Sequence, residues 1–324
     1  MRCLVTGVAG FIGSHLAERL VANGHTVIGV DRFSDYYDPS IKKSNLASLM
    51  GSNNFSLVQR DVASLTEREV TNADVIFHLA AQPGVRGSWG RSFETYVSDN
   101  IIATQRLLEL VKGLKLRRFV FASSSSVYGE AGPNPATEDE QTKPLSPYGV
   151  TKLAAENLCM TYYRNYWVPA VTLRYFTVYG PRQRPDMAFH RFIRAARDEK
   201  PLVIYGTGNQ KRDFTFVSDA VDANISCIEA DCVGRIMNIA GGRSVEVMET
   251  VRILESLTGK SLKLKFEENR RGDVSSTAGD ITLAKEVLSF NPKITLEEGL
   301  KAELDWIVNL TENRSGEISV IPPA

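Results

Sequence analysis

The chain has 324 residues, of which 43% are hydrophobic and 23% are charged, and this composition suits a large buried core in one big domain or two unequal ones. The 38 Lys and Arg residues balance 38 Asp and Glu residues, so net charge gives no reason to expect nucleic acid or a membrane surface as the partner. No apolar run approaches the roughly 20 residues of a membrane span, and the N-terminal segment lacks a signal-like apolar stretch. We therefore expect a cytoplasmic protein.

The cysteines show no pattern that indicates a disulfide framework or a metal site. Cys3, Cys159, Cys227 and Cys232 form no C-x-x-C pair, and no histidine stands at metal-ligand spacing from them. We predict buried or inert thiols in a reducing compartment, and no bound metal.

The first half of the chain alternates short apolar runs with longer amphipathic segments. In residues 11–23, Ile12, Leu16 and Leu20 recur at four-residue spacing, which places them on one face of a helix. The apolar runs are continuous, as in strands that are buried on both faces of a parallel sheet between two helical layers. This doubly wound α/β class has predicted strands at 3–5, 27–30, 56–58, 74–79, 118–121 and 170–173, and predicted helices at 11–23, 101–112 and 152–166.

Three glycines, Gly7, Gly10 and Gly13, stand between the first predicted strand and the first predicted helix. The first glycine permits a tight turn, the second lets backbone approach a pyrophosphate, and the third lets the helix pack on the strand. The helix N-terminus then offers N–H groups and the positive end of its dipole to phosphates. This context favours a dinucleotide site over the alternative interpretation, a plain tight turn.

Asp31 closes the second predicted strand, 18 residues after Gly13. A carboxylate there accepts the ribose hydroxyls of an adenosine and repels a 2′-phosphate, which favours NAD over NADP. Arg32 is the opposing signal, because an arginine at this place can hold a 2′-phosphate.

Two later strand ends extend the predicted dinucleotide site. Asp61 and Val62 end the third strand, where the adenine would lie, although a plain loop aspartate is the alternative. His78 ends the fourth strand, and we interpret it as a packed strand residue rather than a ligand. The residues after it, Leu79, Ala80 and Ala81, include small ones that permit close approach of a cofactor to the backbone.

The segment 122–129, ASSSSVYG, has the composition of a flexible linker, but it directly follows an apolar strand. A strand that ends in Ser123 and Ser124 carries hydroxyls to the carboxyl edge of the sheet, where open α/β sheets bind ligands. We therefore predict that this segment is the edge of an active site.

Tyr148 and Lys152 are four residues apart, which puts both side chains on one face of a helix. A tyrosine is a poor base at neutral pH, but a nearby ammonium and the positive ring of NAD⁺ favour its phenolate. A phenolate tuned in this way can remove a proton from a substrate hydroxyl, and Ser124 can hydrogen-bond the same oxygen.

The alternation of apolar runs and amphipathic segments ends at about residue 176. After this point Gly- and Pro-containing turns interrupt the sequence and arginines become frequent. We predict a nucleotide-binding domain of the Rossmann type at 1–179 and a smaller α/β substrate domain at 180–324. A helix at 218–230 and a strand at 235–239 are expected to return to the first domain, within about 214–242. Residues 311–324 are expected to be frayed.

These motifs resemble a known family, the extended short-chain dehydrogenases/reductases that act on nucleotide sugars. The resemblance covers residues 4–306 and is strongest to UDP-sugar 4-epimerases. Within these it points to UDP-glucuronate 4-epimerases, on the stretch Pro83-Gly84-Val85-Arg86 and on residues 184–189, RPDMAF. The motifs that carry it are G-x-x-G-x-x-G, Asp31, HLAA, SSSSVYG, SPYGVTK, RYFTVYGPRQRPDM and RDFTFVSD.

The resemblance also implies roles for individual residues. Ser124, Tyr148 and Lys152 match the family's catalytic trio. Thr177 stands where many hexose epimerases carry an Asn that touches the sugar nucleotide, and glucuronate-type members share this departure. Arginines suit a diphosphate because a guanidinium is permanently charged and bidentate. The cofactor residues implied are Gly7, Gly10, Phe11, Ile12, Gly13, Asp31, Arg32, Asp61, Val62, Leu79, Ala80, Ala81, Asn100, Tyr148, Lys152, Tyr175 and Val178. The substrate residues implied are Arg86, Ser124, Ser125, Ser126, Thr177, Arg184, Arg191, Tyr205, Arg212 and Arg270.

The reaction implied is NAD-dependent epimerisation of UDP-glucuronate to UDP-galacturonate, through transient oxidation at C4, rotation of the 4-keto sugar and return of hydride. Dehydratases and decarboxylases of this family carry Asp or Glu where this chain has Ser125 and Ser126, which disfavours both activities. UDP-glucose or an N-acetyl sugar is the alternative substrate. A non-catalytic, NAD-sensing binding protein is the alternative of another class, and the intact catalytic trio argues against it.

Family members commonly dimerise through two helices per subunit, here at 93–112 and 150–166, so a homodimer is also expected. Leu107, Leu108 and Leu158 fit a helix face at such an interface, but they can equally face the sheet.

Overall fold

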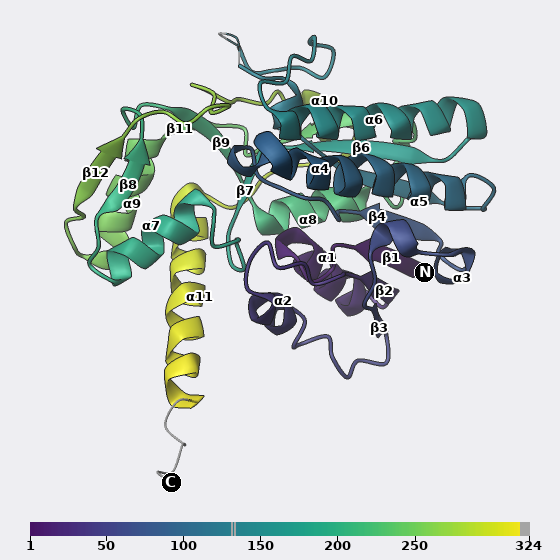
Figure 1. Ribbon diagram of the computed structural model, residues 1–324, viewed down its shortest axis with the longest axis horizontal. Helices are drawn as coiled ribbons and strands as arrows, with labels where there is room; N and C mark the ends of the chain where they lie inside the picture. The colour runs from purple at the N-terminus through teal and green to yellow at the C-terminus, as the bar shows by residue number, and fades with distance from the viewer. Residues whose placement is uncertain (131, 133, 318–324) are drawn as a thin grey trace.

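A computed structural model describes residues 1–130, 132 and 134–317 and shows a seven-stranded parallel sheet between two layers of helices (Figure 1). The order across the sheet is β10-β6-β5-β4-β1-β2-β3. The order reverses beside β1, which pairs with β2 on one side and with β4 on the other. The strands are β1 (Arg2–Thr6), β2 (Thr26–Val30), β3 (Phe55–Val58), β4 (Val75–His78), β5 (Arg118–Ser124), β6 (Ala170–Tyr175) and β10 (Ile236–Ile239). The predicted doubly wound α/β class is confirmed.

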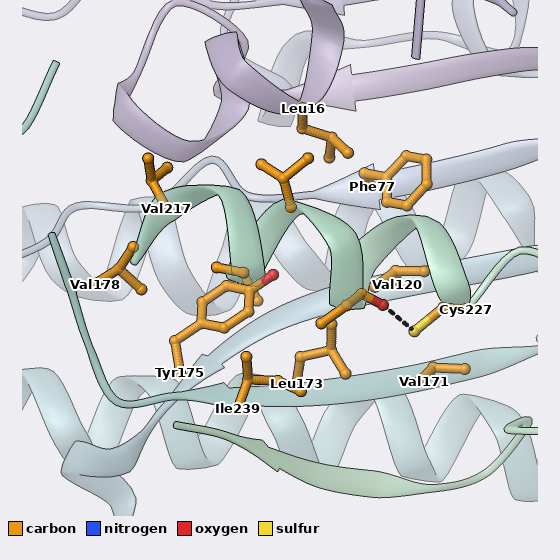
Figure 2. Packing of buried hydrophobic residues seen from close by; sticks show 14 of the residues in the cluster. Leu16, Phe77, Val120, Val171, Leu173, Tyr175, Val178, Val217, Cys227 and Ile239 are labelled. Atoms are coloured by element: carbon orange, nitrogen blue, oxygen red, sulfur yellow. Dashed lines mark hydrogen bonds between the residues drawn. The ribbon is translucent and has the colours of Figure 1, made fainter. Parts of the chain in front are cut away.

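Both faces of this sheet are buried, which explains the continuous apolar runs in its strands. On β4, Val75 and Phe77 join one core cluster while Ile76, between them, joins another. Figure 2 shows the first cluster, in which Leu16 and Phe77 lie with residues of the neighbouring strands around one helix. Helices α1 (Phe11–Ala22), α8 (Val217–Ser226) and α10 (Thr282–Leu288) contribute to the first cluster, and α3 (Glu67–Val70), α5 (Ala103–Val111) and α6 (Pro147–Tyr166) to the second.

Strand β5 runs through Ser124, three residues beyond the strand predicted from its apolar run. A single 3₁₀ turn, Ser125–Val127, follows it, and the Ser124 hydroxyl caps this turn by accepting the Ser126 N–H at 3.1 Å. The serine run is therefore the end of a strand and its cap, which confirms that it is not a linker.

Helix α6 begins earlier than its apolar pattern indicated, at Pro147. Ser146 caps it, with its hydroxyl accepting the Gly149 N–H at 3.1 Å, and Pro147 occupies the first helical position, where a missing N–H is harmless. Tyr148 and Lys152 thus lie in the first turns of a firmly capped helix. Before α5, residues Val97–Ile102 form a π-helical segment, so the predicted helix at 101–112 starts inside it.

The second half of the chain adds two small sheets and a third core beside the carboxyl edge of the large sheet (Figure 1). One sheet has the order β11-β9-β7 and the other pairs β12 with β8. The elements are β7 (Thr177–Tyr179), α7 (Ala188–Arg197), β8 (Leu202–Tyr205), β9 (Lys211–Phe216), β11 (Ser244–Glu246), α9 (Val247–Thr258), β12 (Leu264–Glu267) and α11 (Leu296–Glu317). Helix α11 extends to Glu317, so the expected fraying from residue 311 is wrong up to that point, and residues 318–324 lie outside the described part.

The chain crosses back to the large sheet twice. Strand β10 pairs with β6 at its edge, in the segment for which a return was expected. A second return, not predicted, brings Ile281, Ala284 and Leu288 of the α10 region into the first core cluster. All four cysteines are buried and free, as predicted. Within the described ranges, no helix has the length and apolarity that spanning a membrane requires.

Candidate active site

A cavity lies along the carboxyl ends of the central strands of the large sheet, at the place where open α/β sheets bind ligands. Its walls come from the turn after β1, the ends of β2, β4, β5 and β6, and the start of α6. The predicted cofactor residues that line it are Gly7, Gly10, Phe11, Ile12, Gly13, Asp31, Arg32, Asp61, Val62, Leu79, Ala80, Ala81, Tyr148, Lys152 and Tyr175. Fifteen separate sequence positions therefore converge on one cavity.

The glycines of the turn after β1 have no side chains to block the approach of a phosphate to the backbone N–H groups. Gly7 has a φ of +70°, and a Cβ there would lie 2.8 Å from the Ala80 nitrogen. A Cβ on Gly13 would overlap the Gly7 carbonyl. Gly10 caps α1 without a side-chain hydrogen bond, so the N–H groups of the first turn are left for an anion. This cradle fits the diphosphate of a dinucleotide.

Asp31 lies at the end of β2 with its carboxylate held by backbone. One oxygen accepts the Ala9 N–H at 3.1 Å and the other accepts the Phe33 N–H at 2.7 Å. Both bonds fix the carboxylate at the cavity wall, where it can still accept ribose hydroxyls through its remaining lone pairs. The Asp31 site fits the adenosine half of NAD.

Two predicted cofactor residues lie apart from the cavity wall. Asn100 is buried, and its amide donates to the Gln82 carbonyl at 3.1 Å and to the Thr151 hydroxyl at 2.9 Å. It ties the loop after β4 to α6 and so supports the wall from behind. Val178 is buried in the first core cluster.

Tyr148 is the side chain at which acid–base chemistry is best placed. Burial raises its pKa above the ordinary value, and a hydrogen bond from Ser124 and the positive charge of Arg184 offset only part of this rise. The Ser124–Tyr148 pair is the one predicted from the sequence. The Tyr148 ring also meets the Tyr96 ring edge to face, with centroids 6.2 Å apart, which fixes its orientation.

The surroundings of Lys152 differ from the expectation. Its Nζ lies 4.5 Å from the centroid of the Phe121 ring, and burial lowers its pKa to about 8, against the opposing influence of Cys159 and Glu156. We predicted that the ammonium of Lys152 would favour the Tyr148 phenolate. In this structure Arg184 supplies a positive charge that does so.

Arg184 comes from the segment after β7 and reaches the cavity that holds Tyr148. Its guanidinium makes two hydrogen bonds to Asp186, at 3.0 and 2.9 Å, and lies 6.0 Å from the Tyr36 ring centroid. The Tyr36 hydroxyl also donates to Asp186, at 3.3 Å. This contact joins a loop of the nucleotide half, which carries Tyr36, to a loop of the second half, which carries Arg184 and Asp186.

No sequence motif identified Tyr36, Tyr37, Lys42, Asp99 or Asp186 as site residues. Tyr36, Tyr37 and Lys42 line the cavity, and the Lys42 ammonium lies 4.8 Å from the Tyr37 ring centroid. The adjacent aromatic pair within a polar loop was the only available signal, and it fits no spacing rule.

A second positive group lies around Tyr205, at the end of β8. Three predicted substrate arginines, Arg86, Arg191 and Arg270, place their guanidinium carbons 4.1, 5.4 and 4.8 Å from the Tyr205 ring centroid. Burial would raise the pKa of Tyr205, but the charges and hydrogen bonds of these arginines lower it overall. We call Tyr205 and these three arginines the arginine cluster.

Arg212 belongs to the same region but is tied to backbone. It donates to the Val274 carbonyl at 2.7 Å and to the Lys211 carbonyl at 2.8 Å, and burial lowers its pKa. With the arginine cluster it concentrates cationic groups that suit a diphosphate. The remaining predicted substrate residues, Ser125, Ser126 and Thr177, follow the ends of β5 and β6, Thr177 as the first residue of β7.

The arrangement combines a dinucleotide cradle, a tyrosine–serine pair at its inner end and cationic groups beyond. Such a site can remove a proton from a hydroxyl next to a bound dinucleotide, while an anionic handle of the substrate is held away from the reacting atom.

Comparisons with known proteins agree with this chemistry. The profile of the family described as GDP-mannose 4,6 dehydratase matches residues 4–302. The uncharacterized UDP-glucose epimerase YtcB of Bacillus subtilis is 45% identical over 317 residues, which span 96% of this chain and 99% of that protein. The UDP-glucuronate 4-epimerase of Thermodesulfobacterium geofontis is 41% identical over 310 residues, 94% of this chain and 95% of that one.

The fold also matches a solved complex. The crystal structure of UDP-glucuronic acid 4-epimerase from Bacillus cereus, with UDP-glucuronic acid and NAD bound, superposes with a TM-score of 0.93. It is 43% identical, and the match covers 96% of this chain and all of that chain.

Proposed function

The chain belongs to the extended short-chain dehydrogenases/reductases that act on nucleotide sugars and is an NAD-dependent UDP-sugar 4-epimerase, and we propose that its sugar is glucuronate, converted to galacturonate. The observation that carries this choice is Arg184, which lines the cavity of Tyr148 and whose charge opposes the rise that burial gives to the pKa of that tyrosine. Arg184 pairs with Asp186, but its guanidinium keeps a permanent positive charge at the cavity wall, which suits a sugar that carries a carboxylate. It offers little to the neutral hydroxymethyl group of glucose.

The catalytic roles follow from the positions of the side chains. Tyr148, as phenolate, takes the proton of the sugar 4-hydroxyl, and Ser124 hydrogen-bonds the same oxygen and stabilises the phenolate. Lys152 lies one helical turn further along α6. Bound NAD supplies the acceptor for the C4 hydride and returns that hydride to the opposite face of the sugar. No net oxidation results.

Rotation of the 4-keto sugar needs a fixed pivot, which we assign to the diphosphate. The arginine cluster and Arg212 lie on the second half of the chain and on the loop that holds Arg86, outside the lining of the Tyr148 cavity. Because these cationic groups lie outside the Tyr148 cavity, they can hold the diphosphate while the sugar rotates beside Tyr148.

A glucuronate substrate is prone to a side reaction, because its 4-keto form is a β-keto acid, which loses CO₂ readily when its C–CO₂ bond stands perpendicular to the carbonyl plane. We propose that the neutral donors Ser124, Ser125, Ser126 and Thr177 hold the carboxylate near that plane. Ser125 and Ser126 stand at the positions where decarboxylases and dehydratases of the family carry acids. Hydroxyls at these positions support epimerisation over the loss of CO₂ or water.

UDP-glucose is the second candidate, favoured by the 45% identity to the relative from Bacillus subtilis. A competition experiment separates the two sugars. The chain is given an equimolar mixture of UDP-glucuronate and UDP-glucose, and the initial rates give the ratio of the two kcat/KM values. We expect the ratio to favour glucuronate by at least about tenfold, which is the effect of one charge-assisted contact. A ratio that favours glucose would overturn the choice of sugar but not the epimerase.

We further propose that the chain works as a homodimer. Phe93, Ile102 and Val150 are exposed apolar residues on three adjoining segments, α4 (Phe93–Tyr96), the π-helical segment and α6. Leu107 and Leu108 are buried in the core of this chain, so they face the sheet and not a partner. Sedimentation of the wild type against the double variant Ile102→Glu, Val150→Glu tests this proposal, with a dimer and a monomer expected respectively.

A further inference from the structure

Arg32 stands at the position where a dinucleotide with a 2′-phosphate would be recognised. It follows Asp31 directly, and it lines the same cavity. A free arginine there would favour NADP, because a guanidinium binds phosphate through two parallel hydrogen bonds. Whether Arg32 is free therefore decides which signal prevails.

The guanidinium of Arg32 is held by two carboxylates from two other elements. Its Nη1 donates to Asp61 Oδ2 at 2.7 Å and to Asp99 Oδ1 at 3.0 Å, while its Nη2 donates to Asp99 Oδ2 at 2.5 Å. The pair with Asp99 is bidentate, which is the strongest geometry for an arginine and a carboxylate. We call these three residues the Arg32 clamp.

Both carboxylates of the Arg32 clamp are themselves fixed. Asp61 caps the short turn after it, and its Oδ1 accepts the Ala63 N–H at 2.8 Å. Asp99 lies in the π-helical segment Val97–Ile102, and its side chain is only 12% exposed. The Arg32 side chain is itself 36% exposed, so it is the bidentate geometry and the fixed carboxylates, rather than burial, that set this pair apart from an ordinary surface ion pair.

The charges of the clamp reinforce one another. Burial alone would lower the pKa of Arg32, but Asp61 and Asp99 raise it, so the guanidinium stays charged and paired. Two carboxylates against one guanidinium leave the cluster with a net negative charge, and Asp31 adds another beside it. A 2′-phosphate bound here would face three carboxylates and one guanidinium, so it would be repelled.

We propose that Asp99, with Asp61, withholds Arg32 from the 2′-position of the dinucleotide and is a specificity-determining residue that enforces the use of NAD. Asp31 alone repels the 2′-phosphate, and the clamp removes the one side chain that would offset this repulsion. The arginine then supports the adenosine pocket as a structural link between Asp61 and the π-helical segment. The inference depends on the dinucleotide site and not on which sugar is bound.

The test measures nucleotide binding in the absence of sugar, so its outcome is independent of the proposed substrate. The full chain is freed of bound nucleotide with charcoal, and the dissociation constants of NAD⁺ and NADP⁺ are measured by calorimetry. The variant Asp99→Asn keeps the shape of the side chain and removes its charge. We expect it to lower the ratio of the NADP⁺ constant to the NAD⁺ constant by at least about tenfold, as a new charge-assisted contact requires.

Two further variants decide how any change arises. In Arg32→Gln, Asp99→Asn the ratio should return to the wild-type value, because the freed arginine is gone. Asp222→Asn is the matched control, since it removes one acid from an arginine pair, Arg19–Asp222, outside the cavity lining, and it should leave the ratio unchanged. If Asp99→Asn fails to fold, as judged by its loss of NAD⁺ binding, Asp99→Ser takes its place.

The inference is overturned by either of two results. The ratio could stay at the wild-type value in the Asp99 variant, which would mean that the clamp does not restrain Arg32. It could also fall equally in the single and double variants, which would mean that relief of negative charge, and not release of Arg32, admits the phosphate.

Discussion

Arg174 and Glu156 face each other in parallel behind the active site, with Nη2 2.6 Å from Oε1 and Nε 3.1 Å from Oε2, and both side chains are almost wholly buried. The same carboxylate accepts the Ser123 hydroxyl at 2.8 Å. One ion pair thus joins β5, β6 and α6, the three elements that carry Ser124, Tyr175 and Tyr148. It lies one helical turn from Lys152, so it fixes the geometry from which the chemistry proceeds.

The first prediction concerns this pair. Glu156→Ala leaves a buried guanidinium without its carboxylate, which should lower the free energy of unfolding by about 3–5 kcal/mol. Urea unfolding followed by circular dichroism measures the change. Lys301→Ala is the control, because it breaks the exposed Lys301–Asp305 pair, whose loss should cost less than about 1 kcal/mol. Equal losses in the two variants would mean that burial adds nothing to the Arg174–Glu156 pair.

The second prediction concerns pH and Arg184. Because the charge of Arg184 lowers the pKa of Tyr148, Arg184→Gln should raise that pKa, and the phenolate should form only at higher pH. The rising alkaline limb of kcat/KM should therefore move to higher pH, with a larger loss of activity at neutral than at alkaline pH. Arg184→Lys keeps the charge and should keep the limb closer to its original position. A uniform loss at every pH would assign Arg184 to binding alone.

The third prediction concerns Asp213, a buried carboxyl that accepts the Gly241 N–H at 2.7 Å and the Gly279 N–H at 3.3 Å. Burial raises its pKa from 3.8 to about 7, despite those bonds. Between these values the folded chain keeps a proton that the unfolded chain has released. The contribution of Asp213 to stability is therefore complete below about pH 4 and falls as pH rises to 7, by up to about 1.4 kcal/mol per pH unit.

Asp213→Asn isolates this contribution, since asparagine does not titrate. The free energy of unfolding of the wild type minus that of the variant should be larger at pH 5 than at pH 8, as measured by urea unfolding at both. A difference that is constant with pH would show that Asp213 does not titrate in the folded chain within this range.

The fourth prediction concerns the fate of the 4-keto sugar. Ser126→Ala and Thr177→Ala each remove a hydroxyl that we assign to the substrate carboxylate, so they should raise the ratio of UDP-pentose to UDP-galacturonate. Chromatography of the products after complete turnover gives the ratio. The control is Ser289→Ala, which changes a hydroxyl just after α10, outside the cavity lining. An unchanged ratio in the first two variants would remove these hydroxyls from the control of decarboxylation.

The positions of strands and helices could be predicted from the sequence wherever a single local residue pattern determines them. Continuous apolar runs between helical periods placed β1, β2, β4 and β6 to within two residues at each end, because burial on both faces leaves no other composition. The glycine turn and Asp31 were predictable for the same reason, since a backbone approach and a ribose contact each demand one residue type.

Contacts that depend on tertiary packing could not be predicted. Helix α10 packs in the first core because the chain returns to the large sheet, and no local signal marks a return. The orientation of Lys152 toward Phe121, and of Arg184 toward Tyr148, depends on which loops meet across the cavity. Asn100 was assigned to the cofactor by resemblance, and in this structure it bonds to Gln82 and Thr151 behind the wall.

The most direct test of the central claim follows the product at C4 of the sugar. The purified chain, without added NAD, is incubated with UDP-glucuronate and, separately, with UDP-glucose, and proton and carbon NMR record C4 stereochemistry and CO₂. We predict interconversion of UDP-glucuronate and UDP-galacturonate with little CO₂ and much slower turnover of UDP-glucose. Faster inversion of UDP-glucose, or CO₂ and a UDP-pentose as the main products from UDP-glucuronate, would contradict the proposed function.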